Sequence, residues 1–305
     1  MTGGQPILIT GGAGFVGSNL ADALAADGCE VIVLDSLSRA GVEQNLQWLQ
    51  ARHGERIRPI IADIRDEGAV REGVAMAGAI FHLAAQVAVT TSVETPVADF
   101  EVNARGTLNV LEAARACSTP PPVIFASTNK VYGSFAETEF RLENDHWQPA
   151  DAALVNGVAE HQPLHLCTPY GCSKGAADQY VLDYAASYGI PAAVLRMSCI
   201  YGPRQFGTED QGWVAHFLIR ARRGERVTIF GDGRQVRDIL HVADAVRAYR
   251  LLLGRIDALS GRAFNLGGGV QNAVSLLQVL DTIEELTGDE VAREHQETRL
   301  GDQLW

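Results

Sequence analysis

The residues of this 305-residue chain best suited to chemistry are Tyr170 and Lys174, which lie four positions apart. On a helix, side chains at that spacing share one face, so the phenol and the ammonium group would be neighbours. A phenol is a weak base because its reference pKa is about 10, and a nearby positive charge favours the phenolate. Lys174 can supply that charge, which indicates proton transfer with a substrate hydroxyl. The spacing alone is also that of an ordinary exposed helix pair.

A second reactive group follows an apolar run, Val123 to Ser127, that predicts the fifth strand of a sheet. Thr128 comes directly after it, at the carboxyl end of the strand. In open α/β sheets, ligands bind outside that edge. The Thr128 hydroxyl can therefore donate to a substrate oxygen and hold it beside the phenol of Tyr170.

Three glycines, Gly11, Gly14 and Gly17, lie between the apolar run 7–10 and a helical pattern from Ser18 onward. The first glycine allows a tight turn, the second lets a pyrophosphate approach the backbone, and the third allows close helix–strand packing. The helix N-terminus then offers free N–H groups to phosphates. Without further context, the same glycines could form a turn that binds nothing.

Asp35 supplies that context, because it ends the next apolar run, 31–34. An acidic residue roughly 20 positions after the glycines is placed to bind the ribose hydroxyls of a dinucleotide. The carboxylate would repel a 2′-phosphate, so NAD is expected rather than NADP. Arg39, in the loop with Ser38, is the counter-argument, since an arginine can accommodate that phosphate.

These groups need a scaffold, and the hydrophobic pattern predicts one. Strands are expected at 7–10, 31–34, 56–61, 79–85, 123–127 and 192–196, with helices at 100–115 and 170–188. Strands alternating with helices predict a Rossmann-type α/β fold, a doubly wound parallel sheet with right-handed crossovers. The small residues Ala84 and Ala85, after Leu83, would let the backbone approach a cofactor.

Two further strand ends carry polar residues. Asp63, at the end of the third strand, is placed to touch an adenine edge, whereas Asp66 suits a helix N-cap.

His82, in the fourth strand, is expected to be a packed histidine rather than a catalytic one. The polar stretch 137–168 is expected to be a long loop without regular structure.

Beyond residue 196 the alternation fails, and glycine-rich polar segments alternate with short helices. We expect a cofactor-binding domain over 1–195 with a return segment at about 238–265. Residues 196–237 and 266–305 would form a smaller, interwoven substrate-binding lobe.

Composition excludes several classes of protein. A net charge of −12 opposes nonspecific nucleic-acid binding, and no apolar run is long enough to span a membrane. The five cysteines lack C-x-x-C spacing, so reduced structural thiols are expected rather than disulfides or a metal site. The first strand begins within a few residues of the start, which leaves no room for a signal peptide and predicts a cytoplasmic protein.

The motifs together resemble the extended short-chain dehydrogenase/reductase superfamily. The resemblance rests on these segments: Thr10–Gly17, Thr128 with Val131–Gly133, Tyr170-x-x-x-Lys174, Cys199–Pro203 and Arg237–Val242 with Asp244. It implies a bound NAD, a nucleotide-diphospho-sugar substrate, and a homodimer formed through the helices at 100–115 and 170–188.

The resemblance also implies site residues. The catalytic set would be Thr128, Tyr170 and Lys174, with Lys174 also contacting the nicotinamide ribose. The cofactor set adds Gly11, Gly14, Phe15, Val16, Gly17, Asp35, Ser38, Arg39, Asp63, Ile64, Leu83, Ala84 and Ala85. The substrate set would be Gln86, Thr128, Asn129, Arg204, Gln205, Gln211, Trp213, Arg237 and Arg299, with Arg237 and Arg299 as diphosphate ligands.

Within the superfamily, segments 128–133, 173–180 and 197–213 resemble the 2-epimerases of CDP-linked dideoxyhexoses. The alternatives are a 4-epimerase, a 4,6-dehydratase and a non-catalytic NAD(H) sensor. A dehydratase usually has Asp-Glu after the threonine, whereas this chain has Asn129 and Lys130. A sensor has no need of a phenolate. Superfamily members usually continue through another helix or two after the position of Arg299, so the substrate lobe is expected to end early.

Overall fold

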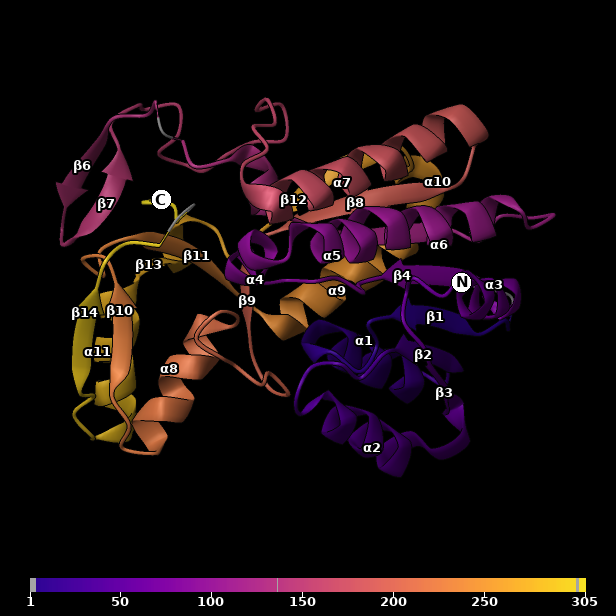
Figure 1. The fold of residues 1–305 in the computed structure, drawn as a ribbon, viewed down its shortest axis with the longest axis horizontal. Helices are drawn as coiled ribbons and strands as arrows, with labels where there is room; N and C mark the ends of the chain where they lie inside the picture. The colour runs from indigo at the N-terminus through magenta and orange to yellow at the C-terminus, as the bar shows by residue number, and fades with distance from the viewer. Residues whose placement is uncertain (1–3, 136, 300–301) are drawn as a thin grey trace.

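Most strands form where apolar, β-branched residues run without interruption, because such strands are buried on both faces of a parallel sheet. The computed structural model describes residues 4–135, 137–299 and 302–305. Its central sheet contains β1 (Ile7–Thr10), β2 (Val31–Asp35), β3 (Ile57–Ile61), β4 (Ala79–His82), β5 (Val123–Thr128), β8 (Ala192–Met197) and β12 (Arg262–Leu266). The order β12-β8-β5-β4-β1-β2-β3, with every neighbouring pair parallel, confirms the doubly wound fold (Figure 1).

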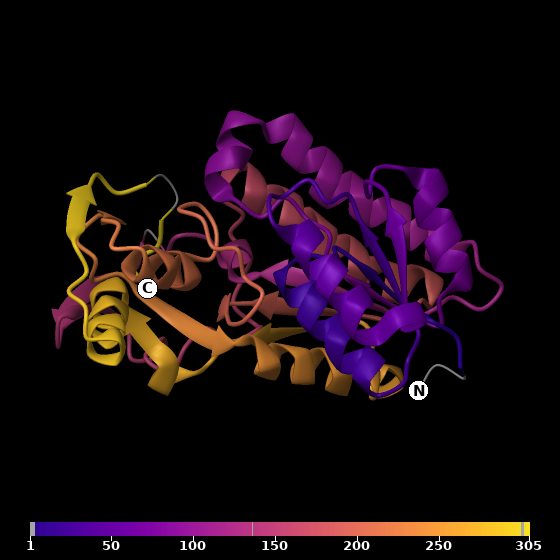
Figure 2. The same ribbon diagram turned by 90° about the horizontal axis from the view of Figure 1, so that it is seen from below.

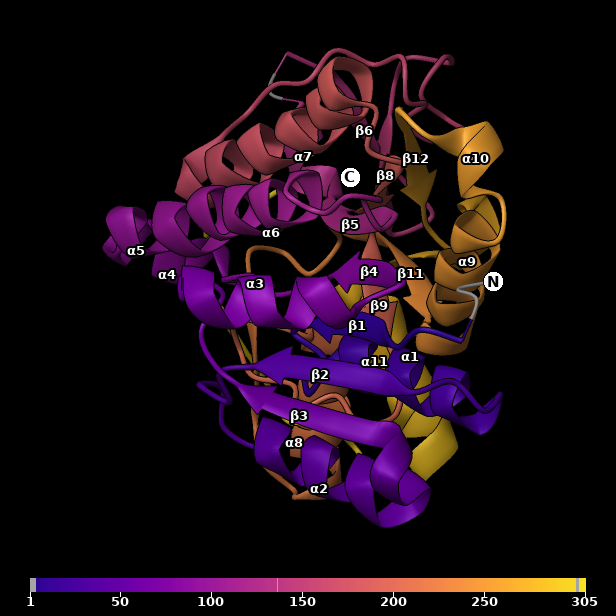
Figure 3. The same ribbon diagram turned by 90° about the vertical axis from the view of Figure 1, so that its right-hand side faces the viewer.

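Helices cover both faces of this sheet and enclose two separate cores (Figure 3). One face carries α1 (Phe15–Ala26), α2 (Val42–His53) and α9 (Val242–Leu253); the other carries α3 (Glu67–Met76), α6 (Gly106–Arg115) and α7 (Thr168–Tyr188). On the first face Leu20, Leu49 and Tyr249 are fully buried, and on the second Val70 and Leu111 are.

Three predicted boundaries differ from the structure. The fourth strand ends at His82, three residues before its predicted end, although the Leu83 N–H still donates to the Thr10 carbonyl of the neighbouring β1 at 3.0 Å. The helix predicted at 100–115 begins earlier, as α4 (Val89–Glu94) and α5 (Pro96–Phe100), and reaches α6 through a π-turn at Glu101–Arg105. The stretch expected to be irregular contains an antiparallel hairpin of β6 (Phe140–Glu143) and β7 (His146–Pro149).

The smaller lobe lies beyond the carboxyl ends of the sheet strands (Figure 2). It contains β9 (Cys199–Tyr201), β10 (Val227–Phe230), β11 (Val236–His241), β13 (Ala273–Ser275), β14 (Arg293–Gln296), α8 (Trp213–Arg222) and α11 (Leu276–Thr287). Phe217, Ile229 and Leu280 form the centre of its own core. From β11 the chain returns through α9 and α10 (Ile256–Leu259) to β12, the edge strand of the main sheet.

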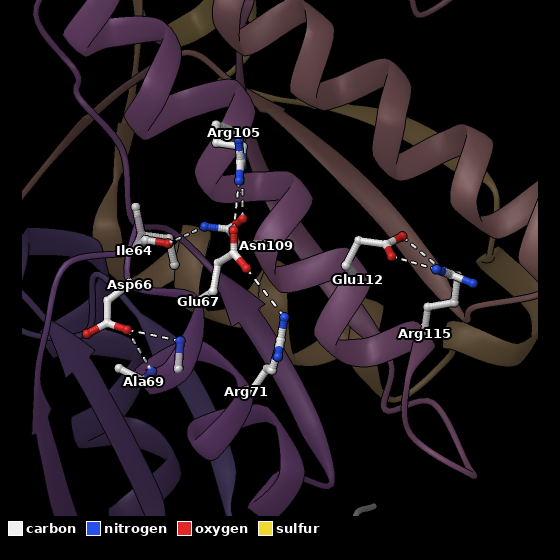
Figure 4. A network of polar contacts seen from close by, with 10 residues as sticks. Ile64, Asp66, Glu67, Ala69, Arg71, Arg105, Asn109, Glu112 and Arg115 are labelled. Carbon is white, nitrogen blue, oxygen red and sulfur yellow. Dashed lines mark hydrogen bonds and ion pairs between the residues drawn. The ribbon is translucent and has the colours of Figure 1, made fainter.

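A polar network fixes α3 against α6 (Figure 4). Arg105 bridges to Glu67 at 2.7 Å, and the Asn109 amide donates to the Ile64 carbonyl at 3.1 Å. Asp66 caps α3 by accepting hydrogen bonds from the Gly68 and Ala69 N–H groups, as its position predicted. The network therefore holds the turn at the end of β3, where cofactor residues were predicted.

Within the described ranges, no helix combines the length and the apolarity that a membrane crossing requires. The five cysteines are free thiols.

Candidate active site

Tyr170 and Lys174 lie in the first turns of α7, which begins with Thr168 and has Pro169 in its first turn. Proline fits a helix start because its missing N–H would have no intrahelical partner there. Both side chains are buried, and the Tyr170 hydroxyl is hydrogen-bonded to Thr128 at the end of β5. The structure thus brings the phenol to the Thr128 hydroxyl and places Lys174 one helical turn after Tyr170 on α7.

The Lys174 ammonium group is held from the sheet side. Its Nζ donates to the Ala126 carbonyl at 2.6 Å and lies 4.1 Å from the centre of the Phe125 ring. Both contacts come from β5, so the strand that ends in Thr128 also fixes the lysine. The pair is therefore not an exposed helix pair.

Burial governs the proton affinities of this pair. It raises the pKa of Tyr170 to about 12; the hydrogen bond with Thr128 lowers that pKa and the charge of Asp99 raises it. Burial also lowers the pKa of Lys174 to about 7, against the attraction of Asp178 and Asp99. In the chain by itself, desolvation of the phenolate is the largest effect on the pKa of Tyr170.

A first supporting network was not predicted. Ser173 donates to the buried carboxylate of Asp99, and Asn103 donates to the same carboxylate at 3.1 Å. Asn103 also bonds the backbone of Gln86, accepting its N–H at 2.9 Å. The π-turn in the helix carries Asn103 and places it between α7 and the loop after β4.

A second unpredicted network surrounds Asp178, one helical turn after Lys174. Arg196 makes a two-point ion pair with Asp178, with both N–O distances 2.9 Å, and donates to the Tyr132 hydroxyl at 3.0 Å. Ser127 donates to Asp178 at 2.7 Å. The signal in the sequence was a charged residue, Arg196, in the apolar strand β8, and Asp178 one helical turn after Lys174.

The glycine turn fits a dinucleotide pyrophosphate. A Cβ on Gly17 would lie 2.2 Å from the Gly11 carbonyl oxygen, so only glycine allows α1 to pack this closely. A Cβ on Gly14 would meet only that same oxygen, at 3.1 Å, so the outer side of the turn is open. Phe15 and Val16 begin α1 there, where the first N–H groups lack intrahelical partners.

Asp35 ends β2 beside this turn, and its carboxylate accepts the Ala13 N–H at 3.0 Å and the Leu37 N–H at 2.9 Å. Burial raises its pKa. Ser38 and Arg39 are exposed on the following loop. These positions suit a ribose at the end of β2.

Other predicted cofactor residues lie along the neighbouring strand ends. The Asp63 carboxylate is bound by Arg65 at 2.9 and 2.8 Å, which lowers its pKa. Ile64 is buried, and Leu83 and Ala84 lie against Gly11, where an added Cβ would be 2.7 Å from the Ala84 nitrogen. Ala85 follows them in the same loop.

His82 is confirmed as a packed histidine. Its ring nitrogens lie 2.7 Å from the Thr10 hydroxyl and 2.9 Å from the Thr107 hydroxyl. Complete burial lowers its pKa to about 3, so the ring is neutral.

The predicted diphosphate ligands lie in the small lobe and are engaged within the chain. Arg237, on β11, pairs with Asp302. Arg299 pairs with Glu209 at 2.5 Å and lies 3.6 Å from the centre of the Phe230 ring. Each guanidinium must exchange these partners to bind a phosphate.

The remaining predicted substrate residues divide into two groups. The Asn129 amide oxygen accepts from Thr128 at 3.4 Å, and the buried Gln205 Oε1 and Trp213 Nε1 lack hydrogen-bond partners in the described structure. Gln211 pairs with Thr208 through the backbone. Arg204 lies elsewhere: its guanidinium is 4.0 Å from the Trp48 ring centre and its carbonyl accepts from Asn45, which ties it to the glycine turn.

The pKa directions predict a titration that NMR can measure. In cofactor-free protein labelled with ¹³C at the lysine ε-carbons, Lys174 should lose its proton near pH 7 and Lys130 near pH 8. Burial and, for Lys130, the charge of Arg237 cause both reductions. The Lys174→Met variant assigns the signals. Two signals that titrate at about 10.4, the value of a free lysine side chain, would contradict the burial argument.

Known proteins resemble this chain in sequence. Residues 7–267 match the model of the NAD dependent epimerase/dehydratase family. A CDP-paratose 2-epimerase of Salmonella typhi is 43% identical over 286 residues, which cover 92% of this chain and 83% of the relative.

Solved structures agree with the fold. A Thermotoga maritima UDP-glucose 4-epimerase with UDP-glucose has a TM-score of 0.81 at 33% identity, covering 97% of this chain and 87% of the other. A Thermus thermophilus UDP-glucose 4-epimerase in complex with NAD has a TM-score of 0.80 at 34% identity, covering 97% and 88%. The parallel sheet agrees with these matches, and the chain belongs to the NAD-dependent epimerase/dehydratase family.

Proposed function

We propose that the protein is a 2-epimerase of a CDP-linked dideoxyhexose, interconverting CDP-paratose and CDP-tyvelose. The observation that carries the proposal is the buried Thr128–Tyr170–Lys174 group beside a glycine turn that fits NAD. The likeness to the Salmonella typhi 2-epimerase supports the choice of substrate.

Chemistry constrains how such a site inverts C2. The C2 hydrogen of the sugar is not acidic, so simple deprotonation is ruled out and the carbon must be oxidised first. When bound, NAD supplies the acceptor for the C2 hydride and its later donor. Tyr170 takes the proton of the C2 hydroxyl while Thr128 holds the same oxygen. The C2 ketone then presents its other face, and Tyr170 returns the proton as the C–H bond re-forms.

Lys174 acts on Tyr170 through charge. A protonated lysine beside the phenol stabilises the phenolate that proton removal requires. Its contacts to Ala126 and Phe125 hold it in place on the sheet side. Because the redox change at C2 is reversed within one turnover, no external oxidant is consumed and the cofactor stays bound.

One observation supports a second candidate, a 4-epimerase, though less strongly. Solved 4-epimerases share the fold, so inversion at C4 uses the same catalytic group on another carbon. A 4,6-dehydratase fits less well, because Asn129 and Lys130 stand where an acid pair is usual.

We also propose a cytoplasmic homodimer. The five free cysteines support a reducing compartment. Val97, Phe100 and Tyr188 are large exposed apolar or aromatic side chains on α5 and α7, and a second copy of the chain would cover them.

Replacing Tyr170 by Phe tests the mechanism. The variant should lose about 100-fold to 10,000-fold in kcat, since that is the usual contribution of a general acid–base group. Its NAD content, measured after denaturation, should stay unchanged. Tyr180→Phe, on the exposed side of the same helix, is the control and should keep its activity. A Tyr170→Phe variant of near-normal rate would remove the phenol from the mechanism.

A panel of nucleotide sugars tests the substrate. CDP-paratose and CDP-tyvelose should be interconverted faster than UDP-glucose or UDP-galactose, with products resolved by NMR. The expected preference follows from the resemblance of segments 128–133 and 197–213 and from the 43% identity to the 2-epimerase. Faster conversion of the UDP-sugars would instead establish the 4-epimerase alternative.

A further inference from the structure

Lysine is nearly absent from this chain. Of the 25 lysine and arginine residues, 23 are arginines, and the two lysines are Lys130 and Lys174. Arginine therefore serves as the cation everywhere except at two positions. Lys174 belongs to the proposed catalytic group, which leaves Lys130 as the remaining position with an ammonium group. A compact ammonium ion and a planar guanidinium are not interchangeable where a ligand must fit.

The surroundings of Lys130 make it an unusual cation. Its Nζ donates to the neutral amide of Gln303 at 2.8 Å, and in the described ranges no carboxylate lies within ion-pairing distance of it. Burial and the charge of Arg237 lower its pKa to about 8. The neighbouring acid, Asp302, is already paired with Arg237. Of these two neighbouring cations only Arg237 is paired with the carboxylate, so an anion placed between them would be stabilised.

The position of Lys130 indicates which anion. Its backbone N–H donates to the Thr128 hydroxyl oxygen at 3.2 Å, so one turn carries both side chains. Thr128 is the proposed partner of the reacting sugar oxygen, and Arg237 is a proposed diphosphate ligand. Lys130 therefore lies between Thr128 and Arg237, the residues proposed to hold the reacting sugar oxygen and the diphosphate.

We propose that Lys130 is a substrate-binding residue whose ammonium group contacts the phosphate attached to C1 of the sugar. This inference rests on the proposed function and deepens it. In a hexose, C2 is bonded to C1, which carries the phosphate, whereas C4 lies across the ring. A cation between Thr128 and Arg237 thus suits a substrate that reacts next to its phosphate. Anchoring the phosphate also leaves the ring free to turn and present the other face of C2.

The competing explanation is that Lys130 only holds the C-terminal segment 302–305. Gln303 also donates to the Gly133 carbonyl, and the Leu304 carbonyl accepts from Val236 at 2.8 Å. These contacts fix the segment without Lys130. Replacing Gln303 by Ala removes the lysine's partner and leaves the ammonium group, so it separates the two explanations.

Calorimetric binding of CDP and CMP to the NAD-containing protein tests the proposal, with UDP and UMP run in parallel. Lys130→Met should weaken CDP binding about tenfold or more, the usual cost of losing a charged hydrogen bond, and CMP binding much less. Gln303→Ala should bind CDP as tightly as the unaltered protein or more tightly. NAD content reports whether each variant is folded.

NMR of the unaltered protein tests the same contact without a substitution that could prevent folding. In unaltered protein labelled at the lysine ε-carbons, CDP should shift the Lys130 signal and CMP should not. The proposal is overturned if Lys130→Met binds CDP normally, if Gln303→Ala loses as much affinity, or if CDP leaves the Lys130 signal in place. If the protein binds UDP more tightly than CDP, the assignment of a CDP-linked substrate is wrong. The proposal for Lys130 is then tested by comparing the binding of UDP with that of UMP in the same variants.

Discussion

The burial of the Lys174 ammonium group is the constraint on which the site depends. Removing a charge from water is costly unless hydrogen bonds and opposite charges compensate. The Ala126 carbonyl supplies the direct hydrogen bond, and Asp99 and Asp178 supply negative charge from two sides. Each acid is in turn held by its own partners, Ser173 and Asn103 for Asp99, and Arg196 and Ser127 for Asp178. The polar groups around α7 thus compensate for the burial of this one cation.

The same networks link the proposed catalytic group to the neighbouring strands and loops of the main sheet. Asn103 extends the first network to Gln86 in the loop after β4, next to the glycine turn. Arg196 extends the second network to Tyr132, whose hydroxyl donates to Asn265 on β12 at 2.7 Å. Because β5, β8 and β12 are adjacent, these bonds fix the turn that carries Thr128 and Lys130. The position of the edge strand β12 therefore bears on the position of Thr128.

Much of this could be predicted from the sequence, because the decisive signals are local. Apolar runs predicted the parallel strands, and the glycine spacing and the Tyr170–Lys174 spacing predicted where ligands would bind. The Asp178–Arg196 pair could not be found so easily, since its partners are 18 residues apart and meet only when α7 packs on β8. The hairpin β6–β7 was missed because each of its strands has only four residues, too few for a clear alternating pattern. The raised pKa of Tyr170 could not be predicted either, because it comes from burial, which depends on the tertiary fold.

The central claim is that C2 loses a hydride and later regains the same hydride. Tyr170 accepts and returns only the proton of the C2 hydroxyl. Conversion of CDP-tyvelose or CDP-paratose in D₂O tests it most directly, with NMR of the product at C2. The epimer should form with ordinary hydrogen at C2, because the hydride never exchanges with solvent. Deuterium at C2 of the product would contradict the account and indicate inversion through an enol.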